Sequence, residues 1–488
     1  MSGNILSQLA FIVPELLLAL GGVFLLLLGV FSSTNAYKVV NFCAIIILFL
    51  AIVVALKNHH TGYAFGNAIK LDLFNRFLKI LILLGTFFSL MLAYAYNKFE
   101  LLDKFELPIL YLFASFGMLL MVSASNMLSL YFGLEIQSIS LYALAAFDRN
   151  NIKSSEAGMK YFILGALSSG MLLYGISIIY GYTGQLGYLE IAQNLKMGTY
   201  NIGLVFGLIF ILCALAFKVS AVPFHMWTPD VYEGAPTPIT AFFASSSKIA
   251  AIGLLANLVV QVFPSLYTMT GAMPACKQIM LILAVLSMFF GAFAAIGQIN
   301  IKRLMAYSSI SHVGYILLAI FSANMSAMLG LLIYLSVYLV TTIGVFAFIL
   351  SIRNEANSNE QIYDISGLAK SNPLLASFMT IYLLSFAGIP PLAGFFAKWY
   401  VISATIEVGY IGLAIAAVIA AVISSFYYLR VIKIIWFDEA NNNFSHPTGT
   451  LKFILWATAL LLLFYVLFAG WMYKEAYMAA LSFMLITL

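Results

Sequence analysis

The sequence is poor in charge, and this scarcity decides its broad class. Only 8% of the 488 residues are charged, whereas 63% are hydrophobic and the mean hydropathy is +1.03. An ordinary soluble domain carries about 25% charged residues, and so few charges cannot cover a globule of this length with a hydrated surface. A soluble all-α protein is therefore excluded, and the sequence predicts an all-α polytopic membrane protein.

Residues that build metal, disulfide and nucleotide sites are also scarce. The three cysteines, Cys43, Cys213 and Cys276, lie far apart in different apolar segments, and the five histidines form no HExxH or HxH pattern. No strand-flanked GxGxxG motif marks a dinucleotide site. We therefore expect no metal and no bound cofactor in this chain, and the small net charge of +5 does not indicate a nucleic-acid partner.

Long apolar runs fill most of the chain. Each is long enough for a span of roughly 20 residues, and the sequence predicts about fourteen spans. The runs begin near Ile5, Val39, Leu73, Leu107, Asn126, Ala157, Ile202, Ile239, Gln278, Leu304, Met325, Pro373, Val408 and Leu451. The first run is predicted to be a retained helix, because it lacks the basic n-region and small-residue cleavage site of a signal peptide and carries Glu15.

Charge in the loops predicts the orientation of these spans. Lys and Arg are more frequent in one set of alternate loops, which places the amino terminus outside, and an even number of spans puts both termini on that side. Lys70 and Lys79 are assigned to the outer loops. The chain is expected to divide into an N-terminal three-helix segment (1–100), a first half (107–263), a second half (275–436) and a C-terminal helix (451–488).

A helix break beside a charge is the most informative feature. Lys218 ends a long apolar run, and Pro223 is the first of four prolines within sixteen residues. Proline interrupts a helix, and non-helical backbone at membrane depth persists only where it is buried in protein or lines a wet cavity. This combination predicts that the chain moves ions or protons.

A second break has the same character. Pro390 and Pro391 interrupt the stretch 373–406, which is too long for one straight span, and Lys398 follows them. Two discontinuous helices in corresponding places predict two inverted five-helix repeats, as in many transporters, with 107–262 set against 278–436. Lys218 precedes its break, however, whereas Lys398 follows its own.

Four lysines fall inside the predicted spans: Lys160, Lys218, Lys248 and Lys398. A charge at the bilayer centre costs on the order of 2.5 to 3.5 kcal/mol, so such residues usually face the protein interior and mark a pathway. The alternative is snorkelling, in which a long side chain carries its amine to the headgroups. Both alternatives stay open for Lys160, near the start of its run, whereas the depth of Lys248 favours the pathway over snorkelling.

Two further residues could take part in such a pathway. Glu135, midway along its run, must be protonated, hydrated or paired with a cation, and the lysines are the available partners. We therefore expect it close to Lys218, where it could change whether the lysine holds its proton. His312, among hydroxyl residues, either relays protons or hydrogen-bonds across helices.

Residues 218–242 carry a resemblance to a known family. It rests on the segments Val-Pro-Phe-His-Met-Trp, Pro-Asp-Val-Tyr-Glu-Gly and Pro-Thr-Pro, and continues in residues 135–138, 160–170, 302–315 and 388–395. In these segments the chain resembles the subunit N (mitochondrial subunit 2) family of proton-pumping NADH-quinone oxidoreductase, respiratory complex I. The first three spans and the last are the least distinctive.

The resemblance implies an antiporter-like membrane-arm subunit of fourteen helices that translocates protons. The family pattern would make Glu135 a charge-modulating carboxylate, Lys218 and Lys398 the lysines of the two broken helices, and Lys248 the lysine that connects them. Lys160 would belong to the same polar axis.

The resemblance also implies that partner subunits bind NAD, FMN, iron–sulfur clusters and quinone. The expected partners are other membrane-arm subunits, including antiporter-like sister subunits, and membrane lipids. The expected location is a bacterial plasma membrane, with the mitochondrial inner membrane as the alternative. Two other functions stay open: a subunit of a multi-chain Na+/H+ antiporter, which sodium dependence would reveal, and a structural scaffold that moves no protons.

Overall fold

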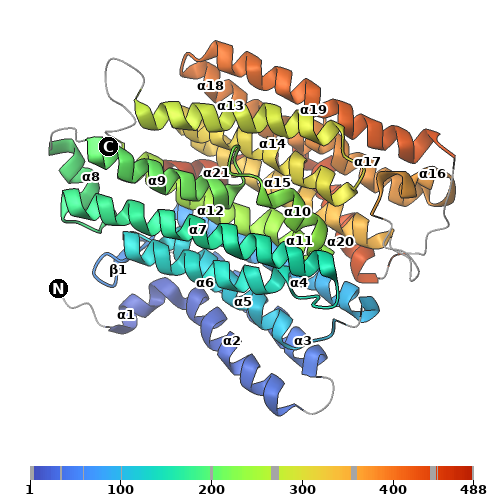
Figure 1. Cartoon of the computed structure of the whole chain (residues 1–488), viewed down its shortest axis with the longest axis horizontal. Helices are drawn as coiled ribbons and strands as arrows, with labels where there is room; N and C mark the ends of the chain where they lie inside the picture. The colour runs from blue at the N-terminus through green and yellow to red at the C-terminus, as the bar shows by residue number, and fades with distance from the viewer. Residues whose placement is uncertain are drawn as a thin grey trace.

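The computed structural model describes residues 5–32, 36–58, 60–100, 102–197, 202–264, 274–352, 360–439, 447 and 449–485. Long helices lie side by side along the longest axis of the molecule (Figure 1). Within the described ranges, the strands form a single antiparallel hairpin of β1 (Gly62–Ala64) and β2 (Ile69–Leu71).

The helices fall into three groups along the chain. The N-terminal group consists of α1 (Ile5–Leu9), the 3-10 turn η1 (Ala10–Ile12), α2 (Val13–Phe31), α3 (Ala36–Lys57) and α4 (Leu73–Glu100). The middle group consists of α5 (Glu106–Ser123), α6 (Met127–Ala145), α7 (Ile152–Thr183), α8 (Tyr188–Met197), α9 (Ile202–Val219), α10 (Trp227–Gly234), α11 (Thr237–Phe242), the π-helical η2 (Phe243–Ser247), α12 (Lys248–Ala256) and the π-helical η3 (Asn257–Val262). The last group consists of α13 (Ala275–Ile296), α14 (Ile301–Ser322), α15 (Met325–Ser351), the 3-10 turn η4 (Ile362–Ile365), α16 (Leu368–Ser371), α17 (Pro373–Ala387), α18 (Ala393–Glu407), α19 (Ile411–Phe437), α20 (Gly449–Leu463) and α21 (Tyr465–Met484).

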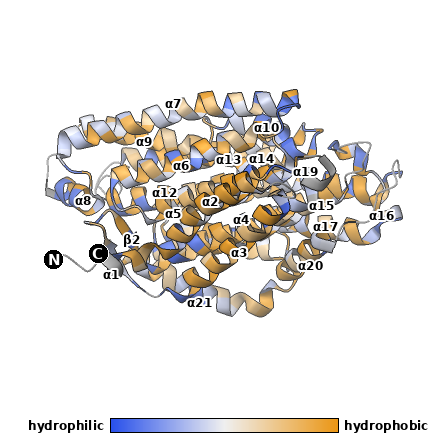
Figure 2. Ribbon diagram, turned by 90° about the horizontal axis from the view of Figure 1, so that it is seen from below, coloured by the Kyte–Doolittle hydropathy of each residue, from blue (hydrophilic) through white to orange (hydrophobic). Residues whose placement is uncertain are grey.

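The predicted all-α membrane class is confirmed. Twelve of the described helical segments are long and apolar enough to cross a membrane, and α20 with α21 forms one more candidate that is bent by 81°. If α17 and α18, on either side of Pro390 and Pro391, are counted as one interrupted span, the total reaches the predicted fourteen. Hydrophobic residues dominate the long helices, and hydrophilic residues gather mainly near their ends (Figure 2).

Asparagine side chains start five of the helices. Each accepts a hydrogen bond from a backbone amide in the first turn, which satisfies a donor that the helix itself cannot. The capped helices are α6 at Asn126, α7 at Asn151, α14 at Asn300, α15 at Asn324 and α17 at Asn372. These caps mark where the chain turns back into the bundle.

The most deeply buried helices lie at the centre of the molecule. The apolar window of the segment Thr237–Val262 is 100% buried, and those of α14 and α15 are each 94% buried, against 28% for Ser7–Phe31. A helix that is hydrophobic on all sides belongs in the interior. The segment Thr237–Val262 carries Lys248 and α14 carries His312, so these two ionisable residues lie in the interior.

The prediction that Lys79 belongs to an outer loop is wrong. Lys79 lies in α4 inside the candidate span Leu73–Tyr94, and its side chain is only 2% exposed. Its amine lies 2.6 Å from Oε1 of Glu15 in α2. A buried ammonium is tolerated where a carboxylate balances its charge, and this partner is remote in the sequence.

Candidate functional site

The first helix break places Lys218 in the interior. Lys218 is the penultimate residue of α9, and the chain passes through Pro223 before α10 begins at Trp227. The Trp227 indole donates a 2.9 Å hydrogen bond to the Phe217 carbonyl, which satisfies an acceptor near the end of α9. The Val222 amide donates a 2.9 Å bond to Ser287 of α13. The break is therefore held by specific polar contacts.

The Lys218 amine is bound by hydroxyls of α6. It donates hydrogen bonds of 2.7 Å to Ser138 and 3.3 Å to Tyr142. Glu135 lies about one turn before Ser138 and attracts the ammonium electrostatically. Its Oε1 has no hydrogen-bond partner among the described residues. The expected neighbourhood of Glu135 and Lys218 is thus present without a direct ion pair between described atoms.

Lys248 connects the two halves of the chain. It begins α12 directly after the π-helical turn η2, and its side chain is buried, with the residue 1% exposed. Its amine donates a 2.7 Å hydrogen bond to Ser309 of α14 and lies 5.5 Å from the centre of the Tyr232 ring. The preceding Ser247 accepts a 2.9 Å bond from Gln137 of α6. Lys248 therefore lies between α6, α10 and α14.

His312 uses both of its ring nitrogens. Nδ1 lies 2.6 Å from the hydroxyl of Tyr334, and Nε2 lies 3.1 Å from the hydroxyl of Tyr428. A neutral imidazole donates through one nitrogen and accepts through the other. Because Ser309 is three residues earlier on α14, His312 lies on the same helix face as the hydroxyl that binds Lys248.

Lys398 lies beyond the second break. It belongs to α18, and its amine donates a 3.0 Å hydrogen bond to the carbonyl of Ala387, the last residue of α17. Lys398 and His312 line the same small cavity, and a second cavity lined by Ser309 shares Tyr338 with it. Each cavity measures about 10 Å³, close to the space that one water needs. His312 and Lys398 thus share one cavity, and Lys248 is linked to the second cavity through its hydrogen bond to Ser309.

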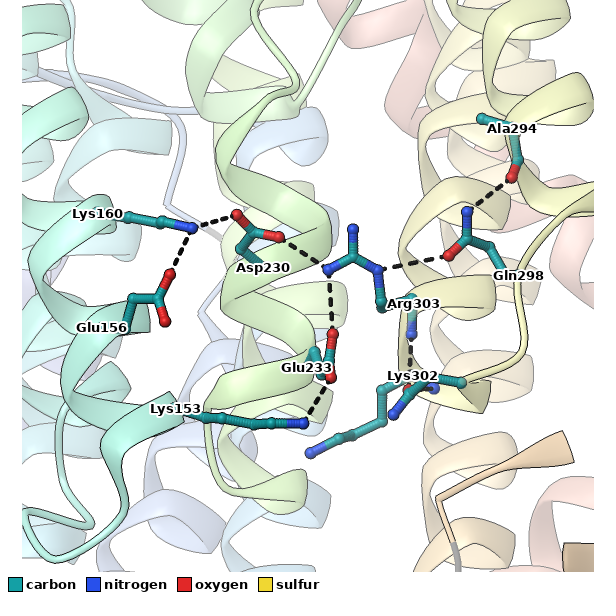
Figure 3. Close-up of polar contacts among 10 residues, drawn as sticks. Lys153, Glu156, Lys160, Asp230, Glu233, Ala294, Gln298, Lys302 and Arg303 are labelled. Carbon is teal, nitrogen blue, oxygen red and sulfur yellow. Dashed lines mark hydrogen bonds and ion pairs between the residues drawn. The ribbon is translucent and has the colours of Figure 1, made fainter.

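Lys160 lies apart from this buried region. Its side chain is 42% exposed, and its amine contacts Glu156 at 2.7 Å and Asp230 at 2.6 Å. Arg303 of α14 binds the other oxygen of Asp230 at 2.8 Å and Glu233 at 3.0 Å (Figure 3). We call Lys153, Glu156, Lys160, Asp230, Glu233 and Arg303 the ionic cluster, and it ties α7 and α14 to α10.

The carboxylates of Asp230 and Glu233 stay charged at neutral pH. They belong to α10, which lies outside the twelve candidate spans. Burial by itself would raise the pKa of Asp230, but hydrogen bonds from Lys160 and Arg303 hold that pKa below its ordinary value. Hydrogen bonds from Lys153 and Arg303 likewise outweigh burial and lower the pKa of Glu233. Sequence reasoning missed this cluster, although the acidic Pro-Asp-Val-Tyr-Glu-Gly segment signalled it.

The chemistry open to these residues is proton exchange among amines, hydroxyls, imidazole and carboxylates. In the part of the chain that the structure describes, no group of three or more His, Cys, Asp or Glu side chains could hold a metal ion.

Known proteins share this sequence and fold. A family model described as NADH:quinone oxidoreductase/Mrp antiporter, transmembrane, matches residues 124–424. The protein named NADH-quinone oxidoreductase subunit N of Bartonella bacilliformis is 52% identical over 99% of both chains. Subunit N 1 of Rhizobium meliloti is 46% identical over 98% of this chain and 99% of its own.

Solved structures agree with the sequence relatives. A chain of respiratory complex I from Thermus thermophilus matches with a TM-score of 0.79 and 30% identity, over 94% of this chain and 97% of that one. A chain of the Mrp complex from a Dietzia species has a TM-score of 0.82 over 96% of this chain and 97% of that one, but at 20% identity it shows the fold alone. From its motifs and from relatives that match over almost its whole length, this chain belongs to the NADH-quinone oxidoreductase subunit N family.

Proposed function

We propose that the chain is an antiporter-like membrane-arm subunit of a proton-translocating NADH-quinone oxidoreductase. Its relatives bear that name, and a chain of a solved complex I shares its fold. Quinone reduction, with NAD, FMN and iron–sulfur clusters, belongs to partner subunits, and sister antiporter-like subunits are its neighbours in the membrane. The named relatives are bacterial, which makes the bacterial plasma membrane its location.

The burial of three lysines without carboxylate contacts carries this proposal. Lys218, Lys248 and Lys398 are 6%, 1% and 6% exposed. Among the described residues, hydroxyl or carbonyl oxygens bind each amine. A scaffold gains nothing from ammonium groups buried in this way, because burying a charge is costly unless it is paired. A lysine can also release its proton inside a protein, whereas an arginine cannot.

The contacts support an order for the proton path. Lys218, under the influence of Glu135, would exchange a proton in the first half, and Lys248 would pass it through Ser309 to the second half. His312 would relay it to Lys398 across the cavity that both residues line. Lys160, held by two carboxylates, would act at the entrance from the ionic cluster.

The arrangement of the helices supports the inverted repeat that the sequence predicts. In the first half, α5 packs along α6, a long α7 follows, and the interrupted pair α9 and α10 comes next. In the second half, α13 packs along α14, a long α15 follows, and the interrupted pair α17 and α18 comes next. The same order of elements therefore occurs twice.

The test is Lys248→Met in the assembled complex, reconstituted into proteoliposomes. Methionine fills a similar volume without a charge, so a proton path through Lys248 predicts a lower ratio of protons pumped to electrons transferred. Lys452→Met, at an exposed position of α20, is the control and keeps the wild-type ratio. A wild-type ratio in Lys248→Met would refute the proton path and favour the structural scaffold.

A multi-chain Na+/H+ antiporter is the second candidate, because the Mrp chain shares the fold. Under this alternative, proton uptake by the reconstituted protein would depend on sodium at constant ionic strength. The proposed function predicts that replacing sodium by choline leaves NADH-driven pumping unchanged.

A further inference from the structure

A polar cavity lies at the hairpin end of the helices, away from the residues assigned above. It measures about 200 Å³, and its lining includes Lys70 of β2, Asn75 of α4, Tyr188 of α8 and Asn257 of η3. Lys196, which also lines it, is exposed, so the cavity reaches the surface. Figure 1 shows β1 and α8 at this same end. Buried polar atoms normally have partners, yet Asn75 Oδ1 and Tyr188 Oη have none among the described residues. The cavity is therefore suited to hold water.

The buried ion pair of Glu15 and Lys79 lies near this cavity, further along the span of α4. Lys79 follows Asn75 by four residues, which places it one turn further along the same face of α4, about 6 Å along the axis. Ser123, two residues before the cavity-lining Ser125, donates a 3.4 Å hydrogen bond to Glu15. The pair thus lies about one helical turn from residues that line the cavity.

This ion pair is incompletely satisfied. The two side chains are 1% and 2% exposed, and their contact is 2.6 Å. Glu15 Oε2 has no hydrogen-bond partner within the described ranges, and Lys79 Nζ makes no hydrogen bond there beyond the ion contact. A buried pair stabilises a fold only when further hydrogen bonds satisfy its remaining donors and acceptors. The pair therefore keeps an acceptor and donors that water could satisfy.

One face of α4 leads from the pair to the centre of the protein. Asn75, Lys79, Ile82 and Thr86 follow one another at spacings of four, three and four residues, which keeps them on one side of the helix. All four are at most 1% exposed. Thr86 lies seven residues beyond Lys79, about 10 Å along the axis.

A hydroxyl cluster surrounds the inner end of this face. The Thr86 hydroxyl lies 2.8 Å from Ser115 of α5 and 3.5 Å from Ser246 of η2. A Cβ on Gly85 would lie 2.4 Å from the Ser246 hydroxyl, so glycine permits this close approach of η2 to α4. Ser246 precedes Lys248, the lysine that joins the two halves, by two residues in the same helical segment.

We propose that Glu15 and Lys79 form a proton-exchange site that joins the cavity at the hairpin end to Lys248 along α4. The inference rests on the proposed proton transfer through Lys248 and adds a branch outside both halves. Along this face of α4, Ile82 and Leu83 lie between Lys79 and the hydroxyl cluster. Both apolar side chains are 0% exposed and close the route until water enters, as in channels that gate by dewetting.

The exchange conserves charge and protons at each step. The Lys79 ammonium passes one proton to the Glu15 carboxylate, which leaves a neutral amine and a neutral acid. The acid releases that proton to the cavity water and becomes a carboxylate again. The Lys79 amine then takes one proton from the hydroxyl cluster. The Lys248 ammonium gives the cluster a proton in return, so that one proton has moved from Lys248 to the cavity. The reverse sequence moves a proton inward.

The first experiment replaces the pair by apolar residues of similar size. A double variant, Glu15→Leu with Lys79→Met, removes both charges together, which buried pairs often tolerate without loss of stability. The assembled complex in proteoliposomes is expected to keep its quinone reductase activity and lose part of its proton-to-electron ratio. Asn41→Leu removes another buried polar side chain from the N-terminal helices and is expected to keep the ratio.

Each outcome of this experiment either supports or overturns the inference. A wild-type ratio in the double variant overturns the inference, and so does an equal loss in Asn41→Leu. If the double variant does not assemble, Glu15→Gln, which keeps the shape of the side chain, is measured in the same way. If Lys248→Met also retains the wild-type ratio, the proposed function itself fails. A loss in Lys248→Met with a wild-type ratio in the double variant refutes only this branch.

The second experiment tests the constriction at Ile82. Ile82→Ser makes this point polar and is expected to admit water, so a pH gradient across the proteoliposome membrane decays faster than in the wild type. Leu81→Ser is the matched control, because Leu81 is also buried on α4 but lies about 160° around the helix from Lys79. Equal decay rates in the two variants, or a wild-type rate in Ile82→Ser, would overturn the gate.

Discussion

The amine of Lys248 and the hydroxyl of Ser309 are joined by a 2.7 Å hydrogen bond that crosses from the first half of the chain to the second. Ser309 itself donates a 2.7 Å bond to the carbonyl of Ala306. Its oxygen can therefore accept from the lysine while its proton is held on the other side. To relay a proton from Lys248, the Ser309 hydroxyl has to turn its own proton from the Ala306 carbonyl to another acceptor.

The Ser309 hydroxyl is expected to be required for coupled activity. Ser309→Ala leaves the buried Lys248 amine without its hydroxyl acceptor, at a cost of about 1 to 3 kcal/mol. We expect slower NADH-driven proton pumping in proteoliposomes, with the complex still assembled. Ser309→Thr keeps a hydroxyl and is expected to restore most of the rate. Equal rates for alanine and threonine would show that the hydroxyl is not used.

Lys218 and Glu135 are expected to act together although no direct ion pair between them is described. Lys218→Ala and Glu135→Ala should each lower the proton-to-electron ratio while the complex assembles, because the amine and the charge that controls it are removed in turn. In the double variant the losses should not add, since both residues serve one step. Wild-type ratios in both single variants would contradict the assignment.

The substitution Lys398→Arg distinguishes a role of Lys398 as a positive charge from a role in proton exchange. Its hydrogen bond to the Ala387 carbonyl could be made by arginine too, because both side chains donate hydrogen bonds and carry a positive charge. Arginine, however, does not release its proton in a protein. We expect Lys398→Arg to assemble but to lose coupled turnover by about a hundredfold, the lower end of the range for proton-transfer groups. Pumping at the wild-type rate would identify a lysine that only caps the helix break.

The ionic cluster is expected to stabilise the contact of α10 with α7 and α14. Asp230→Asn weakens contacts to both Lys160 and Arg303, whereas Glu156→Gln weakens only a contact within α7. These groups are partly exposed, so we expect a loss of about 1 kcal/mol or less for each contact. Thermal unfolding of the detergent-solubilised complex should therefore begin at a lower temperature in Asp230→Asn than in Glu156→Gln. Identical curves would mean that the cluster adds no stability.

Hydropathy and helix-breaking residues were enough to predict the framework of the site. The spans, the breaks at Pro223 and at Pro390 with Pro391, and the depth of Lys248 all depend on local sequence. The bilayer core offers no hydrogen-bond partners to the backbone, so a long apolar run has few alternatives to a spanning helix.

Pairing between remote residues could not be predicted in this way. Lys79 and Lys160 each lie a few residues inside a span. Lys79 is buried in an ion pair with Glu15, whereas Lys160 is partly exposed and contacts two carboxylates. Which of these occurs depends on the rotation of each helix and on its neighbours, and neither is encoded in the position of a lysine within its run. The 81° bend between α20 and α21 likewise has no proline or glycine at Phe464 to announce it.

The helix after that bend completes the packing of the N-terminal helices. After it, α21 packs against α4, where the rings of Phe483 and Phe74 are 4.2 Å apart, and the Phe483 carbonyl accepts a bond from Gln261. The ribosome releases α21 long after α4 has entered the membrane. One flank of α4 therefore has no packing partner until α21 has been synthesised. A chain truncated before Tyr465 would leave that flank exposed to quality-control proteases.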